Sequence, residues 1–208
     1  MDLEYLKQQK NKLFTNYDVF QNFEKDILSS MDCKCSLTTK NQIELLKFLK
    51  NNLNNNISEC FIKDIHQILM DNIINGGIYR NEQVYISNTD YIPPSPEEAF
   101  YMMKCFCFDL QNMSNVDIIK KASFAYFNFI LIHPFINGNG RTGRALLNYQ
   151  LINSGYVPII IKYSDRSKHI EVLEKCLYNN NTSCLENHIY NLELDSIESK
   201  IKQRGGLY

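Results

Sequence analysis

The residues with the clearest capacity for chemistry lie in one stretch, His133 to Arg144, which reads HPFINGNGRTGR. A neutral imidazole titrates near physiological pH and can take a proton from a hydroxyl group, so His133 is a candidate general base. Arg141 and Arg144 are three residues apart, and on a helix they would face the same side. Guanidinium groups bind phosphate oxygens in bidentate fashion, so this pair predicts a bound di- or triphosphate.

Between the histidine and the arginines, the sequence predicts a tight loop that leads into a helix. Pro134 disfavours helical geometry at His133, so the preceding helix should end there. Gly138 and Gly140 let the backbone approach a phosphate closely. The helix that starts near Arg141 would offer free N–H groups and the positive end of its dipole. The stretch therefore predicts a nucleotide-using transferase.

The elements that must position this loop are predicted to be almost all helical. Apolar residues recur at helical spacing along most of the chain. The exception is IYRNEQVYIS, residues 78–87, where alternating β-prone residues predict a short hairpin. We therefore expect a mainly α fold, a helical bundle with a short β-hairpin flap. Helices are expected over residues 2–29, from a Thr39–Gln42 capping box to 53, 58–75, from 95 onward, 115–133, from 141 to 153, 165–178 and 183–203.

Length and composition favour one globular domain with a helical extension. The chain has 208 residues, of which 44% are hydrophobic and 22% charged. The formal net charge of -1 argues against nucleic acid as the main partner, because such proteins normally carry a basic surplus. The sequence contains no apolar run long enough to span a membrane. Its N-terminal stretch is charged, which is not typical of a signal peptide. We therefore expect a cytoplasmic protein without a membrane partner, whose cysteines are reduced thiols.

The stretch from His133 to Arg144 resembles the signature of the Fic family, H-P-F-x-(D/E)-G-N-G-R-x-x-R. Every fixed position matches except the acidic one, which is Asn137 here. The segments IHQILM, YRNEQVYIS, YIPPSPEE and INSGYVPIII are also similar to Fic domains. The resemblance implies a Fic-type helical bundle over residues 58–203, preceded by a helical extension over residues 1–57.

The same resemblance implies a protein adenylyltransferase. Such an enzyme uses ATP with Mg²⁺ or Mn²⁺ and transfers AMP to a Tyr, Thr or Ser hydroxyl of a target protein or of itself. By matching position, His133 is the general base and Asn137 the metal ligand, although a neutral oxygen binds Mg²⁺ more weakly than a carboxylate. The flap would pair its backbone with the target by strand addition. The phosphate-binding positions are Gly138, Asn139, Gly140, Arg141 and Arg144, and the target-docking positions are Tyr79, Arg80, Val84, Tyr85 and Ile86.

A regulatory segment is also implied by the resemblance. Many Fic proteins carry an inhibitory motif, (S/T)-x-x-x-E-(G/N), whose glutamate pairs with the second motif arginine. The stretch that begins at Ser29 aligns with it without gaps, and Cys33 then replaces the glutamate. We interpret this as a degenerate inhibitory motif that leaves Arg144 unclamped. A second match, TSCLEN from Thr182 to Asn187 with Glu186 at the glutamate position, is interpreted as an ordinary helix start.

Some alternatives stay open at this point. The chain is either a working adenylyltransferase or an ATP-binding Fic-fold protein with weak or no transfer. A further alternative is the transfer or removal of another nucleotide group. Dimerisation through helical faces is compatible with the sequence, and the target protein is not specified by it. His66, beside Ile62, Ile65 and Leu69, is interpreted as a core-edge histidine, and His169 as either a border of the adenine pocket or a surface residue.

Overall fold

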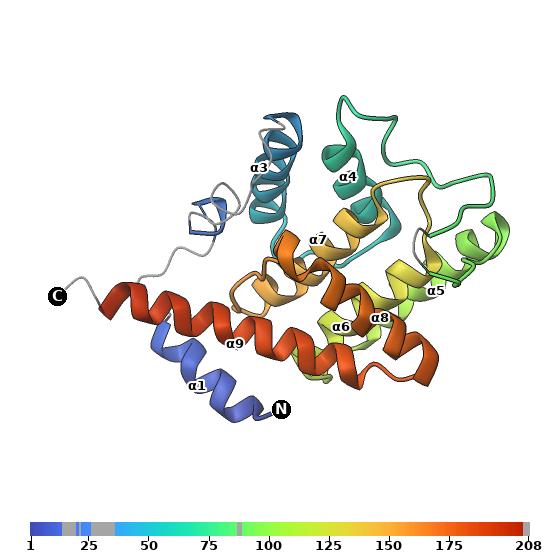
Figure 1. The fold of residues 1–208 in the computed structure, drawn as a ribbon. Coiled ribbons are helices and arrows are strands. Elements are labelled where there is room, and N and C mark those ends of the chain that lie inside the picture. Colours follow the sequence, from blue (N-terminus) through green and yellow to red (C-terminus); the bar gives the residue numbers. More distant parts are fainter. Residues whose placement is uncertain (14–19, 21, 26–35, 87–88, 206–208) are drawn as a thin grey trace.

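The computed structural model describes residues 1–13, 20, 22–25, 36–86 and 89–205, and Figure 1 shows the arrangement of its helices. The predicted mainly α fold is confirmed. At its centre α6 (Ile118–Ile132) packs against α7 (Asn139–Asn153), and the chemistry-bearing loop joins them. Around this pair lie α1 (Leu3–Leu13), α3 (Ser36–Asn51), α4 (Glu59–Met70), α5 (Pro96–Asn112), the short 3-10 helix η1 (Tyr163–Asp165), α8 (Arg166–Asn179) and α9 (Ser183–Gly205).

The central pair belongs to two hydrophobic clusters, which explains why it can hold the loop rigidly. One cluster joins α6 and α7 to α3, α4 and α5, with Phe129 and Phe135 fully buried in it. The other joins the opposite faces to α1, α8 and α9, with Leu147 and Leu151 at its centre. Burial of such side chains stabilises the fold by about 1.5–3 kcal/mol each. The loop between α6 and α7 is therefore anchored at both of its ends.

Side-chain caps fix where the helices around the loop begin. The predicted start of α4 is confirmed, because the Ser58 hydroxyl accepts a hydrogen bond from the Phe61 N–H at 3.2 Å. The predicted capping box of α5 is confirmed as well, with Ser95 and Glu98 bonded reciprocally. In contrast, the predicted Thr39 cap is wrong, because α3 begins earlier and Thr39 lies inside it.

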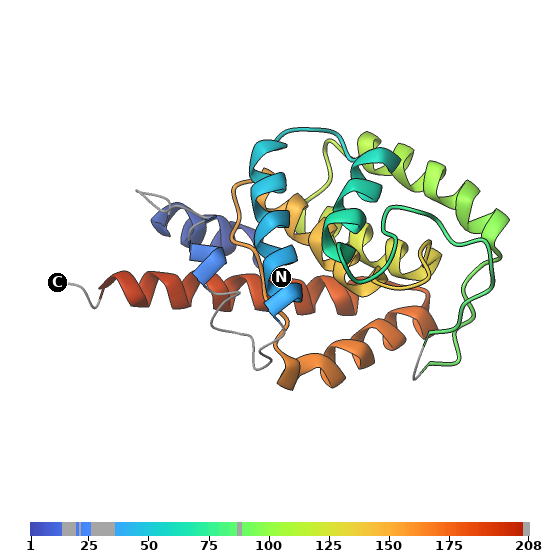
Figure 2. The same cartoon turned by 90° about the horizontal axis from the view of Figure 1, so that it is seen from above.

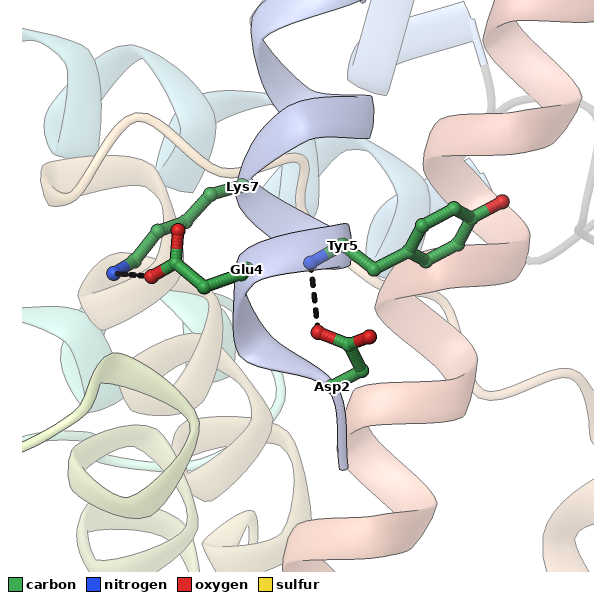
Figure 3. Close-up of polar contacts among 4 residues, drawn as sticks. All are labelled: Asp2, Glu4, Tyr5 and Lys7. Atoms are coloured by element: carbon green, nitrogen blue, oxygen red, sulfur yellow. Dashed lines mark hydrogen bonds and ion pairs between the residues drawn. The ribbon is translucent and has the colours of Figure 1, made fainter.

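The N-terminal helix packs on the last helix of the bundle. Figures 1 and 2 show α1 running beside α9. Leu6 and Leu13 are fully buried in that contact. The Asp2 carboxylate caps α1 by accepting the Tyr5 N–H at 2.9 Å (Figure 3), and the Tyr5 hydroxyl reaches Glu198 of α9 at 3.4 Å. Of the predicted helix over residues 2–29, the part from 3 to 13 forms α1, and much of the remainder lies outside the described residues.

The segment between α4 and α5 differs from the predicted hairpin. It runs as an extended strap around one side of the molecule (Figure 1), and its described residues, 71–86 and 89–95, form no strand. Side chains join its two arms in place of a backbone ladder. Arg80 donates to the Pro94 carbonyl, and the Gln83 amide donates to the Pro93 carbonyl at 2.9 Å. The β-prone residues are present, but no neighbouring strand in the described chain offers them a ladder.

The described residues offer two further negative findings. No helix among them is long and apolar enough to cross a membrane. The cysteines among them that the structure gives as unpaired thiols are Cys60, Cys105, Cys107, Cys176 and Cys184.

A buried carboxyl group in α9 predicts a pH-dependent stability. Glu193 is fully buried, and burial raises its pKa from 4.5 to about 8, against the hydrogen bond from the Val157 N–H. Between these values the folded chain holds a proton that the unfolded chain releases, so stability falls as pH rises through this window. Glu193→Gln should therefore raise the Tm by several degrees at pH 8 and much less at pH 5, measured by thermal denaturation. Asp195→Asn, exposed on the same helix, is the control. Equal shifts at both pH values would contradict the assignment.

Candidate active site

The histidine of the loop is held in an uncommon backbone conformation. His133 ends α6 with φ 50° and ψ 55°, in the left-handed region. A non-glycine residue there costs roughly 1–3 kcal/mol and needs support from its surroundings. Arg80 supplies that support, since its Nε donates to the His133 carbonyl at 2.9 Å and its backbone N–H donates to the Pro134 carbonyl at 2.9 Å. The strap between α4 and α5 therefore fixes the orientation of the imidazole.

The hydrogen bond of the ring determines which nitrogen is free. His133 Nδ1 lies 3.2 Å from the Ile130 carbonyl, which can only accept, so Nδ1 carries the hydrogen. Nε2 then keeps a lone pair, and the ring lines the pocket. Burial lowers the pKa of His133 below 6.5, the Ile130 bond opposes this, and the positive charge of Arg80 lowers it further. The ring is therefore a neutral base at physiological pH.

The loop after the histidine is tied to itself and to α4. The Asn139 amide is buried and exchanges two hydrogen bonds with the backbone of Phe135, at 3.0 and 2.7 Å. Gly138 has φ 81° and is the N-cap of α7, without a side chain to cap the first turn. The first N–H groups of α7 are thus presented toward the pocket, where a phosphate oxygen can accept them. The Gly138 N–H itself donates to Asn137 Oδ1 at 2.7 Å.

Both arginines line one pocket with the histidine. The pocket has a volume of about 730 Å³, in the range of small-ligand sites, and it also includes Gly138 and Gly140. Burial lowers the pKa of Arg141, and the like charge of Arg144 lowers it further. Among the described residues, no carboxylate forms an ion pair with either arginine. Two partly buried positive charges side by side favour an anion between them.

The far end of the pocket is less polar. It is lined by Ile170 and Leu173 of α8 together with Tyr126 and His169. The Tyr126 hydroxyl lies 2.7 Å from His169 Nε2, and the histidine is only 3% exposed. Burial lowers the pKa of His169 to about 3, with help from the charges of His188 and Arg144, so its ring is neutral. The surface interpretation of His169 is therefore wrong, and the pocket combines an anion-binding end, lined by the two arginines, with an end lined in part by Ile170 and Leu173.

The predicted metal position fits an ion that arrives with a nucleotide. Asn137 is exposed at the rim of the pocket, and its amide oxygen accepts one backbone N–H, which leaves a second lone pair. Amide oxygens are accepted ligands of Mg²⁺, which commonly takes one or two protein oxygens and completes its shell with phosphates and water. Among the described residues, no cluster of three His, Cys, Asp or Glu side chains can hold a metal by itself.

The five predicted docking residues divide into two groups. Tyr85 and Ile86 line the pocket, and Tyr85 is 76% exposed. Val84 lies beside them, partly exposed. Tyr79 and Arg80 instead face the protein: the Tyr79 ring lies 5.3 Å from the Phe135 ring, and Arg80 is 4% exposed. The strap therefore presents its outer residues and anchors itself with its first ones, which corrects the prediction that Arg80 is available to a partner.

The two regulatory matches have different outcomes. Ser29 and Cys33 lie outside the described residues, so the degenerate inhibitory motif stays a prediction. Thr182 and Glu186 are described, and the Thr182 hydroxyl donates to the Glu186 carboxylate at 2.8 Å. The Glu186 N–H also donates to the Thr182 carbonyl at 2.9 Å. These contacts belong to the first turn of α9.

The sequence does not indicate the structural roles of two buried polar residues of the site. His66 contacts the loop from α4, and Arg80 contacts it from the strap. Helical spacing places His66 on an apolar face, which is equally typical of a core histidine, and Arg80 lies in a segment that predicts exposed strand. Only the folded structure shows their partners, because His66 contacts Asn137 71 residues away and Arg80 contacts His133 53 residues away.

Gly138 provides a direct test of the phosphate loop. A Cβ added there would lie 2.7 Å from Met70 Sδ and 3.0 Å from His66 Nε2, with φ at +81°. Gly138→Ala should therefore weaken ATP binding by about tenfold or more, measured by calorimetry. Gly155→Ala is the matched control, because it has φ +71° at the far end of α7 and its new Cβ would meet only Lys10 Nζ, at an ordinary contact distance of 3.7 Å. Equal ATP affinity in both variants would contradict the proposed role of Gly138.

Comparisons with known proteins agree with this geometry. Residues 56–151 match the family model described as the Fic/DOC family. Proteins named protein adenylyltransferase Fic are similar in sequence. The protein from Drosophila erecta is 37% identical over 123 residues, which cover 56% of this chain and 24% of the relative. The protein from Drosophila melanogaster is 34% identical over 117 residues, covering 54% of this chain and 23% of the relative. The chain thus matches about a quarter of these relatives' length.

Solved structures share the fold. A Fic domain-containing signaling protein from Bacteroides thetaiotaomicron has a TM-score of 0.80 at 18% identity, covering 99% of this chain and 97% of that one. Fic-1 from C. elegans has a TM-score of 0.74 at 23% identity, covering 100% and 66%. The family model spans α4 through most of α7, which carry the histidine, the loop and both arginines. Residues 56–151 of the chain are thus similar to the Fic/DOC family, and the chain shares the fold of solved Fic proteins.

Proposed function

We propose that the chain is a protein adenylyltransferase that transfers AMP from ATP to a Tyr, Thr or Ser hydroxyl of a protein, including itself. The observation that carries this proposal is the pocket that His133, with Nδ1 bonded and Nε2 free, lines together with the phosphate loop and two arginines without a carboxylate partner in the described chain. The relatives named protein adenylyltransferase Fic support the same activity. The neutral state of His133 suits a base and is ill suited to a phosphate clamp.

The proposed reaction is an in-line displacement at the α-phosphorus of ATP. The acceptor hydroxyl gives its proton to His133 Nε2 as its oxygen attacks, and the bond from the α-phosphorus to the bridging oxygen breaks. Pyrophosphate leaves with that bonding pair. Arg141, Arg144 and the first N–H groups of α7 hold the phosphates and stabilise the charge that develops on them. Asn137 would hold a magnesium ion brought by ATP, which would supply further charge neutralisation.

The proposed acceptor is a protein segment that docks on the strap. The described backbone around Val84, Tyr85 and Ile86 forms no strand ladder, and its Val84 carbonyl accepts only the exposed Gln83 amide, at 3.2 Å, so we propose this segment for strand addition. A protein acceptor is also supported by similarity to IbpAFic2, a variant of which was solved in complex with adenylylated Cdc42. Its TM-score is 0.60 at 19% identity, with 80% of this chain and 59% of that one covered.

The proposed domain organisation treats α4 to α9 as the catalytic unit, over residues 58–203. The preceding residues, 1–57, are the proposed extension, and their described helices α1 and α3 pack on this unit. Support comes from the buried Leu6 and Leu13 in one hydrophobic cluster and Leu45 and Leu49 in the other. The cytoplasmic location and a homo-oligomeric state stay predictions.

The test uses ATP labelled at one phosphate at a time. The wild-type chain is incubated with magnesium and ATP labelled at the α-phosphate, alone and in cell lysate, and proteins are separated under denaturing conditions. We expect label on the chain itself or on a partner, with the added mass of AMP by mass spectrometry. Label that comes only from the γ-phosphate would identify phosphate transfer instead. ATP binding by calorimetry without any covalent label would identify a binding protein and overturn the proposal.

A further inference from the structure

The most unusual contact outside the catalytic groups is made by a histidine in α4. His66 is 1% exposed, and both of its ring nitrogens are bonded to backbone atoms of distant segments. Nε2 lies 2.8 Å from the Asn137 carbonyl in the phosphate loop. Nδ1 accepts the Gly77 N–H, at the start of the strap, also at 2.8 Å. One side chain therefore joins the nucleotide loop to the segment proposed to dock the target.

The polarity of these bonds fixes the state of the ring. The Gly77 N–H can only donate, so Nδ1 carries no hydrogen, and the Asn137 carbonyl can only accept, so Nε2 carries one. The ring is also stacked on Phe135, with centroids 3.6 Å apart and planes 6° apart. Stacking sets the plane of the ring, and the two bonds set its rotation within that plane. No freedom is left for the ring to serve one segment without the other.

The contact lies where the loop turns into α7. Asn137 precedes Gly138, whose left-handed backbone begins the helix. A Cβ on Gly138 would come within 3.0 Å of His66 Nε2, so the ring also fills the space beneath the turn. Loss of the Nε2 bond would free the Asn137 carbonyl and let the turn rotate. The first N–H groups of α7 would then point less accurately at a phosphate.

We propose that His66 is a positioning residue that holds the phosphate loop and the start of the target-docking strap in one fixed relation, with one ring nitrogen for each. The proposal rests on the proposed function of the same pocket. It assigns different consequences to the two nitrogens. Nε2 supports nucleotide binding through the loop, and Nδ1 supports the order of the strap.

Two substitutions separate these bonds. A glutamine amide can reach the place of Nε2 and donate to the Asn137 carbonyl, whereas an asparagine oxygen can take the place of Nδ1 and accept the Gly77 N–H. His66→Gln should keep ATP affinity within about threefold and speed hydrogen exchange at Gly77. His66→Asn should keep Gly77 protected and weaken ATP binding by about tenfold, the loss of one well-placed hydrogen bond.

The experiment measures ATP affinity by calorimetry with magnesium, and amide exchange by mass spectrometry of the same samples. His66→Phe keeps the stacking and lacks both bonds, so it should bind ATP more weakly and exchange the Gly77 amide faster. Asp64→Asn, exposed on the same helix, should change neither ATP affinity nor exchange at Gly77. Thermal denaturation identifies any variant that has not folded, and the glutamine and asparagine pair alone then decides. The proposal would be overturned if the glutamine and asparagine variants behaved identically or showed the reverse pattern. It would also be overturned if His66→Phe had the ATP affinity and the amide exchange of the wild type. Neither readout needs AMP transfer, so a failure of the proposed function is recognised separately.

Discussion

Replacing His133 by alanine is expected to reduce AMP transfer by about 10²–10⁴-fold, the usual contribution of a positioned general base. The imidazole lines the pocket with a free lone pair on Nε2, because its Nδ1–H is bonded to the Ile130 carbonyl. ATP affinity should change little, because the phosphates are proposed to contact the loop and the arginines instead. The measurement is the rate of α-phosphate label transfer together with ATP calorimetry.

A second variant controls for the backbone of this residue. His133 has φ 50°, which alanine tolerates poorly and asparagine tolerates better. His133→Asn should therefore keep the loop conformation and still lose transfer to the same extent, because an amide does not accept a proton at neutral pH. Appreciable transfer by the asparagine variant would show that the histidine acts through structure, and the general-base assignment would be abandoned.

The pH dependence of the wild type follows from the same assignment. The base must be neutral to act, and burial lowers the pKa of His133 below 6.5. The fall of kcat/KM toward acidic pH should therefore have its midpoint below pH 6.5.

Much of the helical framework is predictable from local signals in the sequence. The starts of α4 and α5 follow from Ser58 and Ser95, because capping depends on residues within one turn. The end of α6 at His133 follows from the proline after it. The predicted hairpin of the strap is wrong because a hairpin depends on more than local sequence. Its alternating pattern describes a preference for extended backbone, but a ladder needs a partner strand that local sequence does not specify.

In the candidate site, too, the residues that are close in sequence are predictable and the residues that support them from elsewhere are not. The histidine, the glycines and the arginines lie within twelve residues, so their spacing alone indicates a phosphate site. Their supports come from elsewhere in the chain: His66 from α4, Arg80 from the strap and His169 from α8. Each of these is a polar residue whose partner is a backbone carbonyl, a backbone N–H or a tyrosine far away in sequence. Periodicity detects burial, and it carries no information about such partners.

The second large effect is expected at Arg80, which bonds to the backbone of His133, the proposed general base. Its guanidinium donates to the carbonyls of His133 at 2.9 Å, Glu82 at 3.0 Å and Pro94, with no carboxylate partner in the described chain. Three carbonyls from three places in the sequence thus meet on one planar fork. The fork holds His133 in its left-handed backbone conformation and closes the strap over the loop. Burial is the main cause of the lowered pKa of His133, and the positive charge of Arg80 lowers it further.

Arg80→Met should lower the transfer rate by about 10–10²-fold, because a misplaced base loses its alignment with the acceptor. Loss of the charge should raise the pKa of His133, so the acidic limb of kcat/KM should move to higher pH. Arg80→Lys separates the two effects: it keeps the charge and lacks the fork, so it should retain the wild-type pH limb while staying slow. The measurement is the pH profile of label transfer for all three proteins. A lysine variant as fast as the wild type would show that the charge alone matters, and a methionine variant with an unmoved pH limb would show that the charge of Arg80 does not act on the base.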